Sequence, residues 1–181
     1  MQGKIIIVAV IVIIVFIAGM LFMAYGGRFQ TDENGPYSNS VDLSNQNLTE
    51  IPQEILNDTK LKVLDLTNNK LTSLPSEIGK LINLEELYLG NNELTALPAE
   101  IRQMPKLRIL VASNNNLTGI PAEIGQLQNL KTLQLGLNFI DTYPNELGNL
   151  KNLNILYIKS TDLTDEQIAE IQKMLPNTDI R

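Results

Sequence analysis

Four consecutive stretches of the sequence decide the fold: 61–83 is LKVLDLTNNKLTSLPSEIGKLIN, 84–106 is LEELYLGNNELTALPAEIRQMPK, 107–129 is LRILVASNNNLTGIPAEIGQLQN and 130–152 is LKTLQLGLNFIDTYPNELGNLKN. Each stretch has 23 residues and follows the template LxxLxLxxNxLxxLPxEIgxLxx, where g is most often Gly. A recurrence at so many positions predicts a solenoid in which each unit buries its apolar side against its neighbours.

The template assigns a structural role to each fixed position. LxxLxL alternates apolar residues and predicts a short strand that pairs with the same residues of adjacent units. A Pro is expected at the first helical position of the segment that follows, and a Glu two residues later then lies where the helix dipole favours negative charge. We therefore interpret the recurring Glu as structural.

The Asn at the ninth position is expected to turn its amide inward and to satisfy loop backbone groups that would otherwise have no partner. Stacked units then carry a ladder of such side chains. The predicted ladder consists of Asn69, Asn92, Asn115 and Asn138.

These units resemble leucine-rich repeats of the 23-residue type, which occurs in bacterial proteins and in intracellular Ras-suppressor-like proteins. The resemblance covers residues 38–181. It implies an α/β repeat solenoid, a right-handed arc whose concave face is a parallel sheet. Counting one strand per unit gives six strands.

The ends of the stack must be covered, because an open solenoid leaves apolar faces exposed. Residues 38–60 keep the frame as a degenerate first repeat, in which Gln46 takes the ladder position and Asp58 replaces a core Leu. Such departures from the template are typical of a terminal unit. The four full repeats follow in 61–152.

The last unit, 153–181, is predicted to be a capping repeat that ends in a helix. Thr161 takes the ladder position there. Thr164 and Gln167 are spaced as a capping box. The apolar face of this helix is expected to comprise Ile168, Ile171, Met174 and Leu175, with Pro176 after its end.

The N-terminal part differs from the repeats in composition. After a short tail, 1–4, residues 5–25 form a run of 21 residues without a charged side chain. As a helix this run is about 30 Å long, which matches the hydrocarbon core of a bilayer. We predict one transmembrane helix over 5–25, followed by a polar linker over 26–37.

A cleaved signal peptide is the alternative, because Ala24-Tyr25-Gly26 could serve as a cleavage site. The length of the apolar run and the single basic side chain before it, Lys4, favour an uncleaved anchor. Lys4 and the α-amino group also favour a cytoplasmic N-terminus, with the repeat domain extracytoplasmic. Cleavage would instead give a secreted or envelope-structural protein.

Composition limits the chemistry of the chain. There is no Cys and no His, which removes thiol catalysis and the commonest general base and metal ligand. All 20 acids and 12 of the 14 Lys and Arg residues fall in 31–181, so this part carries about −8. An acidic surface without clustered cations argues against nucleic acid as a partner.

Function is expected on the concave face, at strand positions that the core does not dictate. Aromatic, aliphatic and Arg residues gather from Tyr88, in the third unit of the stack, onwards, as at the centre of many protein interfaces. The predicted protein-binding residues are Tyr88, Arg108, Ile109, Val111, Leu137, Phe139, Ile155 and Tyr157. A simpler explanation is that Val and Ile favour strands in any case.

The sequence therefore predicts a non-catalytic, membrane-anchored module that binds a protein or a peptide. No catalytic residue, metal ligand or cofactor is predicted. An enzyme using the concave carboxylates Asp42, Asp65 and Glu86 is a remote alternative, because an open sheet desolvates them poorly. Asp42 and Asp65 alone are also too few ligands for calcium.

Overall fold

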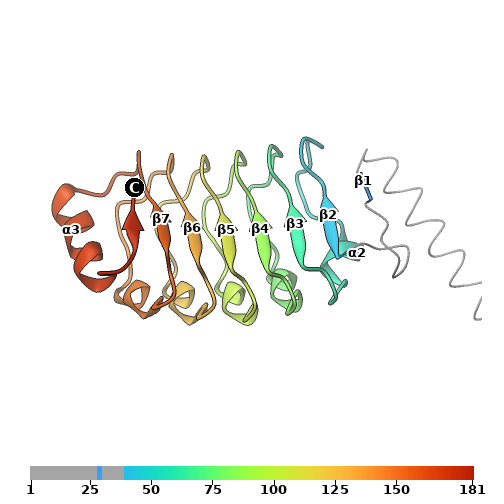
Figure 1. The fold of residues 1–181 in the computed structure, drawn as a ribbon. Helices are drawn as coiled ribbons and strands as arrows, with labels where there is room; N and C mark the ends of the chain where they lie inside the picture. Colours follow the sequence, from blue (N-terminus) through green and yellow to red (C-terminus); the bar gives the residue numbers. More distant parts are fainter. Residues whose placement is uncertain (1–27, 30–38) are drawn as a thin grey trace, which may run out of the picture.

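The computed structural model describes residues 28–29 and 39–181, and its strands form one sheet in chain order (Figure 1). Strands β2 to β8 pair in parallel, and β1 pairs antiparallel with β2. The strands are β1 (Arg28–Phe29), β2 (Ser40–Asp42), β3 (Val63–Asp65), β4 (Glu86–Tyr88), β5 (Ile109–Val111), β6 (Thr132–Gln134), β7 (Ile155–Tyr157) and β8 (Asp179–Ile180). A parallel sheet without crossovers is the arrangement predicted for a solenoid.

The prediction of six parallel strands was wrong by one, because the chain returns to the sheet after the last helix as β8. The Asp179 amide donates to the Asn154 carbonyl at 2.8 Å, and the buried Thr178 hydroxyl donates to the Leu153 carbonyl at 2.8 Å. A two-residue strand without the LxxLxL pattern leaves no periodic signal in the sequence.

The other edge of the sheet carries β1, which lies within the segment predicted as a linker, 26–37. Its register pairs Arg28 with Asp42 and Phe29 with Val41. The predicted transmembrane helix, 5–25, lies outside the described residues. Within residues 28–29 and 39–181, no helix has the length and apolar character needed to cross a bilayer.

Short helices lie on the side of the solenoid away from the sheet, and a longer one closes its C-terminal end (Figure 1). The α-helices are α2 (Gln53–Leu56) and α3 (Asp165–Met174). The full repeats contain the 3₁₀ helices η1 (Ser76–Lys80), η2 (Ala99–Gln103), η3 (Ala122–Gln126) and η4 (Asn145–Asn149).

The prediction that Pro occupies the first helical position was wrong by one residue. Pro75, for example, is the N-cap of η1, with an extended ψ of 155°, and the helix begins at Ser76. Only five residues then separate the Pro from the next core Leu. The tighter i→i+3 pattern fits this short span, as in the 3.0 Å bond from the Ile78 amide to the Pro75 carbonyl. Glu77 does lie in the first turn, as predicted.

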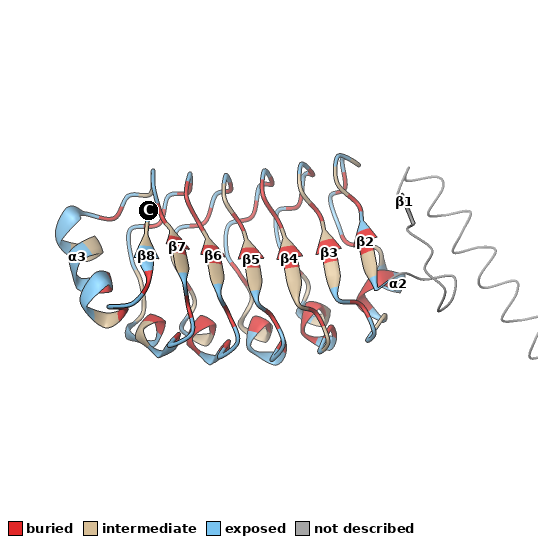
Figure 2. Ribbon diagram, in the orientation of Figure 1, coloured by how far each residue is buried: buried red, intermediate tan, exposed pale blue. Residues whose placement is uncertain are grey.

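The core runs the length of the stack between the sheet and the 3₁₀ helices (Figure 2). The middle residue of each strand from β3 to β7 is a fully buried Leu, and the residues on either side of it are half-buried. Successive helices approach each other closely, and a methyl group at Gly125 would collide with the backbone of Glu146. The small residue in the template therefore sets the spacing of the stack at that point.

The predicted Asn ladder is confirmed, since all four side chains are buried, with exposed fractions of 4–9%. Asn115 is representative. Its amide nitrogen donates to the carbonyls of Ala112 (3.2 Å) and Leu89 (2.9 Å), and its amide oxygen accepts from the Leu94 amide (3.0 Å). One side chain thus satisfies backbone groups in two adjacent repeats.

The two ends of the stack carry other polar residues in place of the ladder Asn. Gln46 donates to the Ser44 carbonyl at 3.1 Å, and Thr161 donates to the Ile158 carbonyl at 2.9 Å. The predicted capping box of α3 is present, with the Thr164 hydroxyl accepting from the Gln167 amide at 3.2 Å. Ile171 and Leu175 are buried, and Ile168 and Met174 pack against the core.

Replacement of Asn115 by Ala should destabilise the repeat domain by about 1–3 kcal/mol, because it leaves the Leu94 amide buried without a partner. The carbonyls of Leu89 and Ala112 keep a second donor, from Asn92 and Asn138 respectively. Thermal and urea unfolding followed by circular dichroism would measure the loss.

Asn116→Ala is the matched control. This neighbouring side chain is exposed and makes only one long contact, 3.4 Å to the Glu93 carbonyl. The control should change stability by less than about 0.5 kcal/mol. Equal effects of the two variants would show that the ladder does not stabilise the fold.

Candidate functional site

The sheet has one face that the 3₁₀ helices do not cover, which we call the open sheet face. It is formed by the residues that flank the buried middle residue of each strand. Along the first of these two rows lie Ser40, Val63, Glu86, Ile109, Thr132 and Ile155, and along the second lie Asp42, Asp65, Tyr88, Val111, Gln134 and Tyr157. This is the face on which the sequence placed the binding residues.

The N-terminal half of the open sheet face is acidic. Asp42 pairs in register with Asp65, and Asp65 with Tyr88. The Tyr88 hydroxyl donates to a Glu86 carboxylate oxygen at 2.7 Å. Desolvation first, then the hydrogen bond and charge of Glu86 and the charge of Asp65, raise the pKa of Tyr88 to about 12. Tyr88 is thus held by the acidic half.

The C-terminal half is largely apolar. Val111 lies directly beside Tyr88 in register. Ile155 and Tyr157 lie two strands beyond Ile109 and Val111, because β6 places Thr132 and Gln134 between them. The predicted residues therefore share one face but form two groups separated by a polar strand. The repeat frame of the sequence places Thr132 and Gln134 between the same groups.

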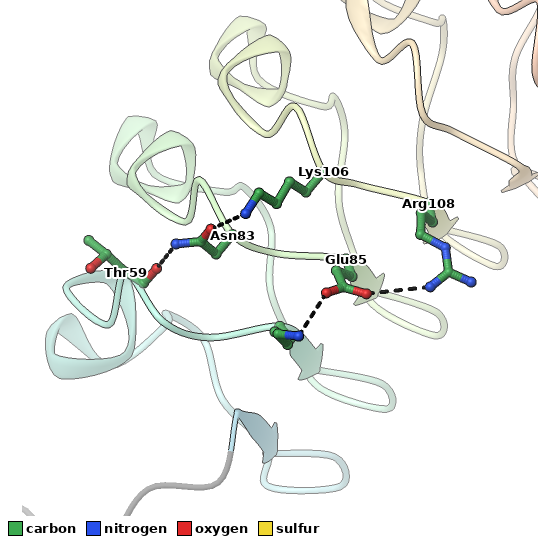
Figure 3. Close-up of polar contacts among 6 residues, drawn as sticks. Thr59, Asn83, Glu85, Lys106 and Arg108 are labelled. Atoms are coloured by element: carbon green, nitrogen blue, oxygen red, sulfur yellow. Dashed lines mark hydrogen bonds and ion pairs between the residues drawn. The ribbon is translucent and has the colours of Figure 1, made fainter. Parts of the chain in front are cut away.

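Arg108, a predicted binding residue, is part of a charged row that borders the open sheet face (Figure 3). Glu85 lies between Lys62, at 3.2 Å, and Arg108, at 3.4 Å. The hydrogen bond from Lys62, followed by its charge, lowers the pKa of the Glu85 carboxyl. These ion pairs join three consecutive repeats, and Arg108 is already paired with an acid of the protein itself.

A second row of polar contacts, which the sequence analysis missed, joins consecutive repeats just before their strands (Figure 3). The Asn83 amide donates to the Thr59 carbonyl at 2.6 Å, and Lys106 donates to the Asn83 amide oxygen at 2.7 Å. Asn129 and Asn152 make the equivalent bonds to the carbonyls of Pro105 and Gln128. The recurring Asn at position 23 of the template was the available signal.

Leu137 and Phe139 lie in the turn after β6 and not on the strand. Both are largely exposed, with exposed fractions of 54% and 58%. Tyr157 connects this turn to the open sheet face, because a methyl group at Gly136 would collide with its ring. The two predicted turn residues are therefore adjacent to the apolar half.

The C-terminal edge of the open sheet face was also missed, because β8 was not predicted. Asp179 pairs in register with Ile155. Arg181 donates from its Nη2 to Asp179 at 2.6 Å. An internally neutralised ion pair thus borders the apolar half.

The acids of the open sheet face do not converge on a metal site. No group of three or more His, Cys, Asp or Glu residues in the described part of the chain could hold a metal ion. Glu86 is hydrogen-bonded to Tyr88, and Asp42 is exposed to solvent. The acids of the open sheet face are thus spread over a surface that a partner could contact.

The sequence matches the leucine rich repeat family over residues 39–94, 59–117 and 105–163, and the chain belongs to this family. Such repeats typically serve as non-enzymatic binding scaffolds. A comparison with curated proteins gave no match.

Solved structures with the same repeat architecture include a leucine-rich-repeat protein of Leptospira interrogans, with 40% identity and a TM-score of 0.76 over 78% of this chain and 36% of that one. The plant peptide hormone receptor RGFR1 in complex with RGF2 has 39% identity and a TM-score of 0.62, over 68% of this chain and 21% of the receptor. The ectodomain of the Arabidopsis thaliana membrane receptor kinase GASSHO1/SCHENGEN3, in complex with CASPARIAN STRIP INTEGRITY FACTOR 2, has 37% identity and a TM-score of 0.63 over 73% and 17%. This chain thus spans at most 36% of these proteins.

Glu86→Gln should lower the pKa of Tyr88 from about 12 while leaving it above 10.0, because desolvation, the largest cause, persists. The neutral phenol is favoured in the folded state, so its contribution to stability is complete below the unfolded pKa and is lost as the pH rises through about 12. The pKa of Tyr88 is measured from the phenolate absorbance as a function of pH, and the Tyr88→Phe variant identifies which part of the signal belongs to Tyr88. A Tyr88 titration unchanged by the substitution would contradict the hydrogen bond.

Proposed function

We propose that this chain is a non-catalytic protein that binds a protein or peptide partner through the open sheet face. The observation that carries the proposal is the half-buried apolar and aromatic set at Ile109, Val111, Ile155 and Tyr157 on a face that no other described element covers. A few well-packed side chains, most often aromatic residues and Arg, supply most of the affinity at protein interfaces, and the contacts around them exclude water.

Two of the structural neighbours support a protein or peptide as the partner class. Both are plant receptors solved in complex with a second molecule, and one is a peptide hormone receptor. The acidic excess of residues 31–181 argues against nucleic acid, because phosphate contacts require clustered Lys and Arg.

We further propose that residues 5–25 hold the chain in a membrane as a single-pass anchor. The support is the sequence itself, a run of 21 residues without charge. The bias of Lys4 and the α-amino group favours a cytoplasmic N-terminus and an extracytoplasmic repeat domain. In the alternative, the segment is removed as a signal and the repeats act as a secreted or envelope-structural protein.

Tyr157→Ala and Val111→Ala should each weaken partner binding by at least about tenfold, the cost of losing an interface hot spot. The full chain in detergent would be used to capture partners from a solubilised membrane extract, with quantitative mass spectrometry of the wild type and the variants.

Ile82→Ala is the matched control, because Ile82 is an exposed apolar side chain outside the strands, with an exposed fraction of 49%. Partners that bind the open sheet face should be recovered equally with the wild type and this control. Equal recovery with Tyr157→Ala and Val111→Ala would overturn the proposed face.

N-terminal sequencing of the membrane-associated protein tests the anchor. An uncleaved anchor predicts a chain that retains residues 5–25 in the membrane fraction and resists extraction by carbonate. A chain that begins near residue 27 and is found in the medium or the soluble envelope fraction would instead establish the secreted alternative.

A further inference from the structure

The turn after β6 contains a residue type that its backbone conformation disfavours. Leu137 has a φ of +58°, in the left-handed region, and an exposed fraction of 54%. Gly adopts this region at least cost because it has no Cβ to crowd the following carbonyl, and Asn is favoured because its short polar side chain can hydrogen-bond locally. Leu137 therefore carries strain without the compensation of burial.

The stack imposes this conformation on every repeat. The equivalent residues have φ values of 56–60° and are short and polar: Asn45, Asn68, Asn91, Asn114 and Ser160. At Leu137 the backbone is held from both sides, since its amide donates to the Lys159 carbonyl at 3.0 Å and its carbonyl accepts from the Asn115 amide at 3.3 Å. The fold therefore fixes the backbone conformation at position 137, but it does not require a Leu there.

Leu137 also lacks the polar atoms that join two pairs of these turn residues. Asn68 donates to Asn45 at 2.9 Å, and Asn114 donates to Asn91 at 2.6 Å. An Asn in place of Leu137 would suit the backbone. A strained, exposed residue that the surrounding fold does not require indicates a role in function.

Phe139 gives the same turn a second exposed apolar side chain. The equivalent residues in the other full repeats are Lys70, Glu93 and Asn116, all polar. Leu137 and Phe139 are two of the three large hydrophobic residues that the described part of the chain exposes to solvent. We call these two residues the apolar turn.

The apolar turn is continuous with the proposed binding face. The Tyr157 ring lies against Gly136, the residue that precedes Leu137. A partner segment crossing β6 and β7 would therefore meet Tyr157 and the apolar turn together.

Charge identifies the chemistry of this partner segment. Lys131 and Lys159, which lie at the beginning of β6 and after the end of β7, form no ion pair with another described residue. Asp42, Asp65 and Glu86 lie on the opposite half of the open sheet face. Asp162 takes the position of Phe139 in the next repeat, whereas Lys131 and Lys159 lie nearer to the strands β6 and β7. The C-terminal half thus attracts an anion and the N-terminal half repels it.

We infer that the apolar turn is the anchor point for an extended polypeptide segment of a partner, which covers Leu137 and Phe139 with a Leu or aromatic side chain and places a carboxylate near Lys159 or Lys131. This inference rests on the proposed function and names the chemistry of its ligand. Counted from the apolar turn after β6, the same segment would carry a basic residue over Asp65 about four residues towards the β3 end. Three strand spacings are about 14 Å, and an extended chain advances about 3.3 Å per residue.

A peptide library displayed on phage, selected against the full chain in detergent, tests the inference. Enriched peptides should contain a large apolar residue next to Asp or Glu and should bind less tightly at high salt. Leu137→Asn and Phe139→Asn should each weaken binding of the enriched peptides by at least about tenfold. Peptides selected against the Lys159→Glu variant should no longer be enriched in Asp or Glu.

A second readout separates this role from a structural one. Leu137→Asn should raise the Tm of the domain by roughly 2–4 °C, because it relieves the left-handed Leu. A gain in stability together with a loss of binding is the expected pair of results. The matched control Asn45→Leu creates the same strain in the turn after β2, beyond the β3 end of the proposed segment. It should lower the Tm while leaving peptide binding unchanged.

The outcomes distinguish this inference from the proposed function. Peptides that lose binding to the Tyr157→Ala variant but still bind the Leu137→Asn and Phe139→Asn variants would overturn the binding role of the apolar turn. The proposal that the open sheet face binds a partner would still hold. Enriched peptides without acidic residues would overturn the charge assignment. Selection that enriches no peptide dependent on either set of residues would overturn both proposals.

Discussion

The rest of the structure depends on a buried Asn side chain that satisfies backbone groups in two repeats at once. Without it, the loop after each strand would bury amides and carbonyls that neither the sheet nor the 3₁₀ helices can pair. Asn92, for example, donates to the carbonyls of Leu66 and Leu89 and accepts from the Leu71 amide. Because these partners lie at fixed distances along the chain, the ladder also fixes the length of the repeat.

This constraint determines where the chain is free to vary. The ladder and the buried Leu at the middle of each strand take up the inward positions, so only the flanking strand residues and the turn after them can differ without loss of the core. The acidic and apolar halves of the open sheet face arise at these free positions. Lys62, Glu85 and Arg108 show that some of the variation is used to join repeats. Lys131 and Lys159, which adjoin β6 and β7, form no ion pair with a described acid.

Departures from the template carry the most information about function. Arg102 replaces the small residue of the other three full repeats, and it extends from η2 to lie 3.7 Å from Glu123 of η3. That departure has a structural explanation in an exposed ion pair between adjacent repeats. Leu137 and Phe139 have no comparable compensation, since both remain exposed. The contrast is the reason for assigning a binding role to the second departure and not to the first.

The sequence by itself determined the repeat, the strand frame, the Asn ladder and the capping box at Thr164, because each is a local pattern repeated or spaced along the chain. It also placed Tyr88, Val111 and Tyr157 on one face, since period two fixes the side of a strand. Only the tertiary structure decided that β8 returns to the sheet and that Leu137 is held in a left-handed conformation. These features depend on contacts with neighbouring repeats, and a single repeat read along the chain does not contain them.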